Sequence, residues 1–156
     1  KYYQGKAPEV DNLNSLDEKV IEHIKEIPNK ISSLIYSYKI REAQAEAINL
    51  ARIGNKYLAD MEPWKIVKTD PIRVQTIINI ALQITANLSI ILQPFLPITA
   101  EKISGFLNFK KTVWEDAGKM NLISSGHETN KPTILFEKIE DQTVTVELEH
   151  LEASSN

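Results

Sequence analysis

The sequence predicts an all-α fold, an antiparallel bundle of four to five helices. Apolar residues recur at steps of three and four over several long segments, as they do on the buried face of a helix. Only 5 of the 156 residues are glycine, which disfavours a turn-rich all-β design. The length suits a single domain over residues 1–156 with a core of its own.

The first predicted helix begins near Asn14, and its apolar stripe runs to Ile35. Asp17 and Glu18 stand in its first turn, where carboxylates interact favourably with the helix dipole. Pro28 interrupts the pattern. Two interpretations follow: one helix bends at Pro28, or a second helix starts there with proline in its first turn.

The second predicted helix runs from about Tyr38 to Asp60 and is rich in alanine, which allows close helix approach. Gly54 lies inside it and costs about 1 kcal/mol against alanine. We therefore expect a close contact at Gly54 or a site where the backbone is needed. The following residues, Pro63 to Val67, are predicted to form a short turn or a single helical turn.

The third predicted helix is the central one. Asp70 is its predicted N-cap, Pro71 occupies the first helical position, and the helix extends to about Gln93. Its apolar residues occupy more than one face, which is typical of a helix buried on most sides.

The last third of the chain is less regular. Thr99 is the predicted cap of a fourth helix, with Ile98 packing inward, and residues 108–132 are expected to be a loop. Residues 140–156 are acidic and are predicted to form a C-terminal helix or a linker. Their TVTVEL segment alternates like a strand, but we favour a helix because no partner strand is visible.

Composition excludes several classes of function. There is no cysteine, so neither a disulfide nor a thiolate metal site is possible. The net charge of -3 does not favour tight non-specific binding to duplex nucleic acid. His23, His127 and His150 are scattered, so we expect no metal site. No membrane-spanning segment is expected, because polar residues break the longest apolar stretch. No set of residues that could act together in catalysis is found.

Trp64 follows a helix break directly, in the segment GNKYLADMEPW. It either plugs the end of the bundle as a core residue or forms an exposed platform shaped by Pro63. An unpaired RNA base stacking on such a platform gains about 1–3 kcal/mol. Nearby cations could contact phosphates, namely Arg52, Lys56, Lys65 and Lys68. Trp114, in a polar loop, is expected to be a packing anchor.

Four short segments occur in a fixed order. The first is REAQAEAINLARIGNKYLADMEPWKIVK, which carries N-x-Y and then P-W. The others are ILQPFLPITAEKISGFLN, VWEDA and GHETNKPTILFEKIED. In this order and spacing they resemble the anticodon-binding helical domain of methionine–tRNA ligases (methionyl-tRNA synthetases), which belong to the class I aminoacyl-tRNA synthetases. The resemblance covers roughly residues 38–141.

The resemblance implies that Trp64 stacks on the first base of the methionine anticodon and that Pro63 shapes this contact. It also implies that an asparagine and an arginine on an earlier helix read the edge of that base, upstream of Lys1. Asn55 and Tyr57 are then expected to be structural residues that fix the helix end presenting Trp64.

The implied parent protein is a cytoplasmic enzyme that ligates methionine to tRNA(Met) using ATP, whereas this chain is expected to be non-catalytic. ATP and Mg²⁺, with Zn²⁺ as an option, belong to the catalytic part, and this domain needs no cofactor. Expected partners are the tRNA(Met) anticodon loop and the catalytic domain of the same chain. The chain begins KYYQGKAPEV, without methionine, and reads like a domain excised from a longer protein or, equally, like a processed chain.

Two other functions fit the same residues. One is a non-catalytic helical scaffold or protein-interaction domain, in which Trp64 belongs to the core. The other is the anticodon-binding domain of a related class I enzyme for leucine, isoleucine or valine, which shares the bundle. The N-x-Y and P-W segment favours methionine over these three.

Overall fold

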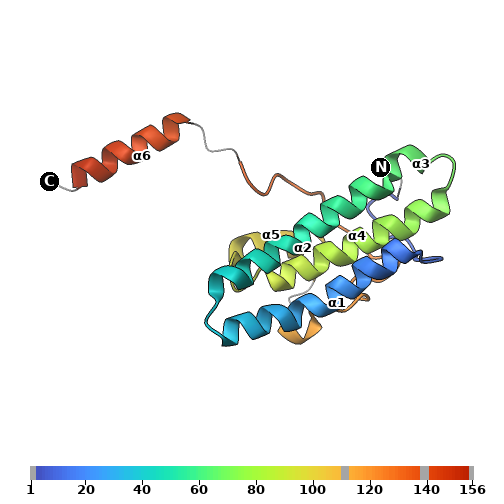
Figure 1. Cartoon of the computed structure of the whole chain (residues 1–156). Helices are drawn as coiled ribbons and strands as arrows, with labels where there is room; N and C mark the ends of the chain where they lie inside the picture. The colour runs from blue at the N-terminus through green and yellow to red at the C-terminus, as the bar shows by residue number, and fades with distance from the viewer. Residues whose placement is uncertain (1–2, 110–112, 138–140, 155–156) are drawn as a thin grey trace.

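The computed structural model describes residues 3–109, 113–137 and 141–154. Within these residues four long helices form a bundle, as the sequence predicts: α1 (Ser15–Tyr36), α2 (Ile40–Met61), α4 (Pro71–Ile91) and α5 (Pro97–Phe106). Helices α1, α2 and α4 pack against one another, and α5 packs against α4 near its C-terminal end (Figure 1). The all-α prediction is therefore confirmed for the part of the chain that the structure describes.

Helix α1 begins where the sequence predicts, and its start is closed by a reciprocal cap. The side chain of Asn14 accepts hydrogen bonds from the backbone of Leu16 and Asp17, at 2.9 and 3.0 Å. The Asp17 carboxylate accepts one in return from the Asn14 backbone, at 2.9 Å. Pro28 lies buried inside one continuous helix, so the two-helix interpretation is wrong.

Helix α4 is the buried centre of the bundle, as its apolar faces predict, and one of its faces is polar. Asn79, Gln83 and Asn87 recur at steps of four and are all buried. Their amides bond the backbone of two non-helical segments, at Pro8 and along residues 118–123, over 2.6 to 3.0 Å. Through this row of amides, α4 packs on this face against non-helical segments of the chain and not against another helix. Helix α4 is also long and apolar enough to cross a membrane, but most of it is buried in the bundle.

Helix α5 differs from the prediction at its start. It begins at Pro97, two positions before the predicted cap Thr99, and its N-cap is Leu96 without a side-chain hydrogen bond. Proline fits the first helical position because its backbone angle is already helical and it has no N–H to satisfy. With this start Ile98 points outward and is exposed, so its predicted inward packing is wrong, whereas Ile103 of the same helix is buried.

The loop after α5 contains one short 3-10 helix, η1 (Trp114–Asp116). Trp114 is half-buried against the core and donates a hydrogen bond from Nε1 to the Ser32 hydroxyl, at 3.0 Å. This contact confirms the expectation that Trp114 is a packing anchor.

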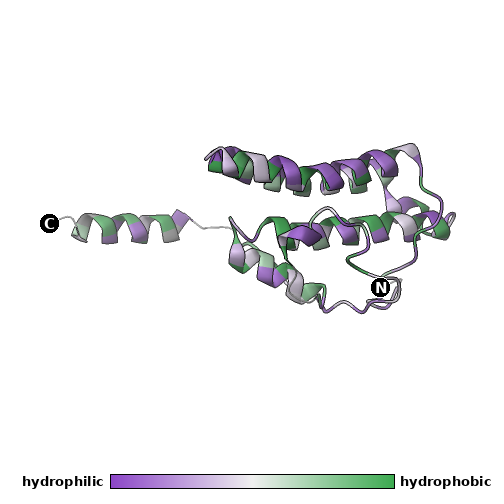
Figure 2. Cartoon of the chain, turned by 90° about the horizontal axis from the view of Figure 1, so that it is seen from below, coloured by the Kyte–Doolittle hydropathy of each residue, from purple (hydrophilic) through white to green (hydrophobic). Residues whose placement is uncertain are grey.

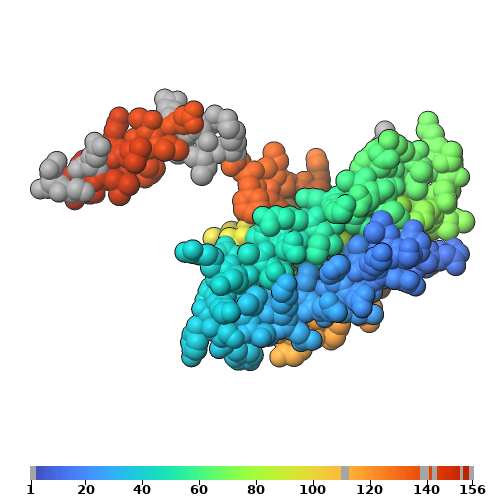
Figure 3. Space-filling view, in the orientation of Figure 1, coloured from blue at the N-terminus to red at the C-terminus, as the bar shows by residue number. Residues whose placement is uncertain are grey.

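The acidic C-terminal segment forms helix α6 (Asp141–Ser154), which agrees with the helical interpretation; residues 140, 155 and 156 lie outside the described residues. Helix α6 stands away from the bundle, whereas α1 and α2 pack side by side along their length (Figure 3). Hydrophobic and hydrophilic residues are mixed along α6 (Figure 2), and its apolar side chains, among them Val144 and Leu148, are exposed.

Candidate nucleic-acid interface

Trp64 lies at a sharp corner between α2 and α4. Helix α2 ends at Met61, and Glu62 takes a left-handed backbone conformation with φ 41°, which redirects the chain. Pro63 then opens the single-turn helix α3 (Pro63–Ile66), as the sequence predicts. The Trp64 side chain is 61% exposed, so it does not plug the end of the bundle. Pro63, by contrast, is buried.

Short-range hydrogen bonds hold this corner. The Lys65 backbone N–H donates to the carbonyl of Glu62 at 2.9 Å, and that of Asp70 donates to the carbonyl of Ile66 at 2.8 Å. Asp70 then caps α4 as predicted, because its carboxylate accepts the backbone N–H of Arg73 at 3.0 Å. The backbone that carries the tryptophan is thus hydrogen-bonded on both of its sides.

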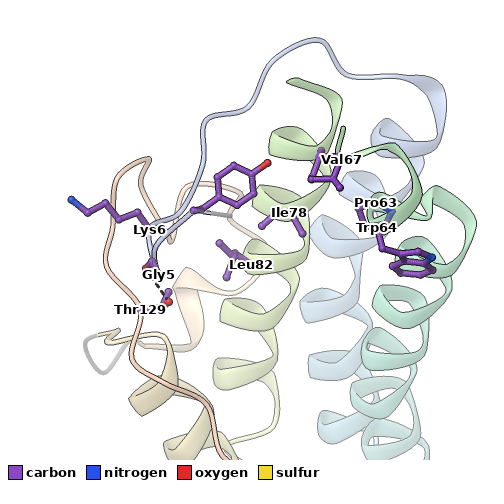
Figure 4. A pocket seen from close by; sticks show the side chains of 10 residues that line it. Gly5, Lys6, Pro63, Trp64, Val67, Ile78, Leu82 and Thr129 are labelled. Carbon is purple, nitrogen blue, oxygen red and sulfur yellow. Dashed lines mark hydrogen bonds between the residues drawn. The ribbon is translucent and has the colours of Figure 1, made fainter. Parts of the chain in front are cut away.

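An apolar cavity of about 400 Å³ opens beside Trp64 (Figure 4). Its walls include Pro63 and Val67 from the corner and Ile78 and Leu82 from α4. The Trp64 indole points away from Ile78 and Leu82 (Figure 4), so its exposed face is separate from this apolar hollow.

Two of the four predicted phosphate-binding cations are engaged in surface ion pairs. Lys56 Nζ lies 3.0 Å from the Asp60 carboxylate, and Lys65 Nζ lies 2.7 Å from that of Glu62. Both ammonium groups remain largely exposed to solvent. Exposed pairs of this kind contribute about 0–1 kcal/mol, so a phosphate group can replace the carboxylate at low cost.

The other two cations, Arg52 and Lys68, are exposed and form no ion pair within the part of the chain that the structure describes. Arg52 and Lys56 are four residues apart on α2 and therefore share one face of that helix. Lys68 lies two residues after the end of α3, on the other side of Trp64 in the chain. The four cations thus flank the corner along the chain, although two of them carry local counter-charges.

A buried charged cluster joins three helices close to this corner. Arg73 of α4 donates from both guanidinium nitrogens to the Asp17 carboxylate of α1, at 2.6 and 2.7 Å. The Tyr57 hydroxyl of α2 donates to the same carboxylate at 2.7 Å. Together with the bond from Asn14, the carboxylate accepts four hydrogen bonds, and Asp17 and Tyr57 are 0% and 1% exposed.

The cluster keeps Asp17 ionised and Tyr57 neutral. Burial on its own would raise the pKa of the Asp17 carboxyl, but the hydrogen bonds from Arg73, Asn14 and Tyr57 outweigh it and lower that pKa. Burial and the neighbouring carboxylate raise the pKa of Tyr57 well above its usual range. The hydrogen bonds to Asp17 also raise the pKa of Arg73.

The structural role expected near the end of α2 belongs to Tyr57 and not to Asn55. Asn55 is exposed, and its side chain makes no hydrogen bond within the described residues. Asp17 and Arg73 were not among the candidates, because the sequence indicates Asp17 only as a first-turn acid. A lone arginine one turn into the otherwise apolar α4 is the sequence signal that could have indicated a buried partner.

Gly54 packs closely against the central helix. A methyl group added at Gly54 would lie 3.1 Å from Cγ2 of Ile84 in α4, closer than an ordinary van der Waals contact. The expected close contact is therefore confirmed. Among the described residues, no group of three histidine or acidic side chains could hold a metal ion.

Known proteins resemble this chain in both sequence and fold. The family model for the anticodon binding domain of methionyl tRNA ligase matches residues 7–153. The methionine–tRNA ligase of Phocaeicola vulgatus is 46% identical over 154 residues, which cover 99% of this chain and 23% of that protein. That of Christiangramia forsetii is 48% identical over 161 residues, with the same two shares. The chain thus spans less than a quarter of the length of these relatives.

The fold is also similar to that of solved structures. The apo form of Mycobacterium tuberculosis methionyl-tRNA synthetase superposes with a TM-score of 0.77 over 87% of this chain and 28% of that one, at 17% identity. The same enzyme in complex with methionyl-adenylate gives a TM-score of 0.75 over 86% of this chain and 27% of that one, also at 17% identity. At this identity the likeness concerns the fold alone.

Proposed function

Because this chain belongs to the family of anticodon-binding domains of methionyl-tRNA ligases, we propose that it recognises the anticodon loop of tRNA(Met) and that Trp64 stacks on an unpaired base there. The observation that carries the proposal is the exposure of Trp64, 61%, on a corner held by its own hydrogen bonds. A fixed aromatic face gives about 1–3 kcal/mol per stacked base without a strongly basic protein. Pro63, buried at the start of α3, shapes this contact by fixing the backbone next to Trp64.

Phosphate groups of the loop are held in this proposal by the flanking cations. Arg52 and Lys68 act without giving up an ion pair, whereas Lys56 and Lys65 exchange a surface carboxylate for a phosphate. These contacts orient the loop and add no sequence preference. Base identity is then read by an asparagine and an arginine that precede this chain in the parent protein.

The parent protein is, in this proposal, a cytoplasmic methionine–tRNA ligase. Its catalytic domain activates methionine with ATP and Mg²⁺, with Zn²⁺ as an optional structural ion of that part, and transfers it to tRNA(Met). The domain described here contributes the anticodon contact and contacts the catalytic domain of the same chain. The relatives support this assignment, because they carry the ligase name and align with nearly all of this chain.

The competing proposals have less support. A scaffold with Trp64 in its core does not fit a side chain that is 61% exposed. A domain from a leucine, isoleucine or valine enzyme does not fit a family model built on the methionine enzymes.

Fluorescence of this chain tests the proposal. The variant Trp114→Phe leaves Trp64 as the single tryptophan. We expect iodide to quench its emission, and we expect an RNA stem-loop with the methionine anticodon to shift that emission and protect it from iodide. A stem-loop with a different first anticodon base serves as the matched RNA. Emission and iodide quenching that stay unchanged at saturating stem-loop would overturn the proposal.

A further inference from the structure

We propose that Asp17, Tyr57 and Arg73 are positioning residues for Trp64: their buried cluster holds α2 and α4 in the relative placement that presents the tryptophan to RNA. The inference rests on the proposed function of Trp64. It adds a set of residues that do not touch RNA and that act through the corner between the two helices.

The place of the cluster in the chain is the first reason. Tyr57 lies near the end of α2, five residues before the left-handed Glu62, and Arg73 lies three residues after the cap residue Asp70. The segment that carries Trp64 therefore starts and ends next to two side chains bonded to one carboxylate. A change in the distance between these two helix ends must move the corner.

Arg73 joins the cluster to the corner directly. Its backbone N–H donates to the Asp70 cap at 3.0 Å, while its guanidinium binds Asp17. The same guanidinium lies 4.0 Å from the sulfur of Met61, the last residue of α2. One residue thus contacts the end of α2, the start of α4 and the anchor in α1.

The hydrogen bonds of the corner join near neighbours in the chain, so they fix its local shape but not its placement relative to α2 and α4. Helix α3 has only 4 residues, lacks a side-chain cap, and starts from the strained Glu62 conformation. Most of the Trp64 side chain is in solvent, so side-chain packing does not set its direction. The direction of the indole therefore depends on the helices that hold both ends of α3.

The chemistry of the cluster suits a role in fixing the relative placement of the helices better than a role in raising the overall stability of the fold. Burying charges is costly, and an apolar replacement of similar size is often equally stable. A bidentate guanidinium–carboxylate pair fixes distance and angle at once, which apolar packing does not. All four hydrogen bonds to Asp17 are formed, and no buried side-chain polar atom among the described residues lacks a partner.

The test uses the full-length ligase that carries this domain, with Tyr57→Phe and Asp17→Asn as variants. Each substitution keeps the shape of the side chain. Tyr57→Phe removes the hydroxyl that donates to Asp17, and Asp17→Asn removes the negative charge that pairs with Arg73. The matched control is Ser89→Ala, which removes a buried hydroxyl that bonds Ala86 at 2.7 Å, sixteen residues beyond Arg73 on α4. Gln83→Leu serves as a second control with a larger expected loss of stability.

We expect Tyr57→Phe and Asp17→Asn to raise the KM for tRNA about tenfold, since a displaced indole loses much of its stacking on the base. We expect kcat and methionine activation to stay unchanged, and both controls to leave the KM for tRNA unchanged. In the 156-residue chain with Trp114→Phe, the cluster variants should also change the iodide quenching of Trp64, which a purely stabilising role would leave alone.

Two outcomes separate this inference from the proposed function. If Trp64→Ala does not weaken stem-loop binding, the proposed function fails. If Trp64→Ala weakens it but both cluster variants behave like Ser89→Ala, the positioning role is overturned while the proposed function stands. Should Asp17→Asn fail to fold, Tyr57→Phe alone decides, because it removes a single hydroxyl.

Discussion

Arg73 contacts both carboxylate oxygens of Asp17, at 2.6 and 2.7 Å, although Asp17 is completely buried. The two residues are 56 positions apart in the chain and belong to α1 and α4. Because Tyr57 of α2 joins the same carboxylate, three helices of the bundle meet at one charge. The cluster lies close in the chain to the corner that exposes Trp64, so it links the stability of the fold to the proposed binding surface.

Replacing Arg73 with methionine should destabilise the domain strongly. The change leaves the Asp17 carboxylate buried without its counter-charge, which typically costs about 3–5 kcal/mol of unfolding free energy. Urea unfolding followed by circular dichroism measures the decrease. A double variant with Asp17→Leu should recover part of it, since both charges are then removed. A decrease below about 1 kcal/mol for Arg73→Met would contradict a structural role for this pair.

Acid should destabilise the wild-type domain through Asp17. The folded-state pKa of Asp17 is lowered, so its contribution is complete above the unfolded-state pKa of about 4 and is lost as pH falls through the folded-state value. The variant Asp17→Asn has no such group, so its unfolding free energy should depend less on pH below about pH 5. Parallel pH profiles for the two proteins would show that Asp17 is not held ionised by the fold.

Adding a methyl group at Gly54 should weaken the packing between α2 and α4. The new carbon would meet buried Ile84 at 3.1 Å, and overpacking of this kind costs about 1–3 kcal/mol, partly offset by about 1 kcal/mol of helix propensity. Gly105→Ala in α5 is the matched control, because nothing lies within 4 Å of the added carbon. We expect thermal unfolding to occur at lower temperature for Gly54→Ala and not for Gly105→Ala. The opposite order would exclude close packing at Gly54.

Arg52 and Lys68 should account for part of the salt dependence of RNA binding. Removing one cation that binds a phosphate should reduce the slope of log affinity against log salt by about 0.7–0.9. We expect Arg52→Gln and Lys68→Gln to show this reduction in stem-loop titrations between low and moderate salt. Lys102→Gln, exposed on α5 at the other end of α4, should leave the slope unchanged. If all three variants give the same slope, Arg52 and Lys68 do not contact phosphate groups of the RNA.

Local rules predict much of this fold from the sequence. The caps Asn14 and Asp70 lie where short-range hydrogen bonding places them, and the apolar pattern of α4 indicates its central position. Pro63 is enough to predict that Trp64 lies at a helix break, but the sequence pattern does not indicate whether the indole ring faces solvent. That choice depends on how the helix ends pack, which involves residues far apart in the chain.

Local rules do not predict contacts between residues that are far apart in the chain. Asp17 is a favourable first-turn acid whether or not Arg73 meets it, so its local sequence carries no sign of the pair. The amides of Asn79 and Gln83 likewise read as interruptions of an apolar stretch until their backbone partners are known. The start of α5 shows a different limit: Pro97 and Thr99 are both good helix-start residues, and only one of them can begin the helix.

The most direct measurement compares two activities of the full-length ligase with Trp64→Ala. Removal of one stacked base predicts a fall in kcat/KM for tRNA aminoacylation of about 5- to 150-fold, the equivalent of 1–3 kcal/mol. ATP-dependent methionine activation, measured without tRNA, should keep its rate, and circular dichroism should show an intact helical fold. Equal loss of both activities, or aminoacylation at the wild-type rate, would contradict a role for Trp64 as the surface on which the anticodon stacks.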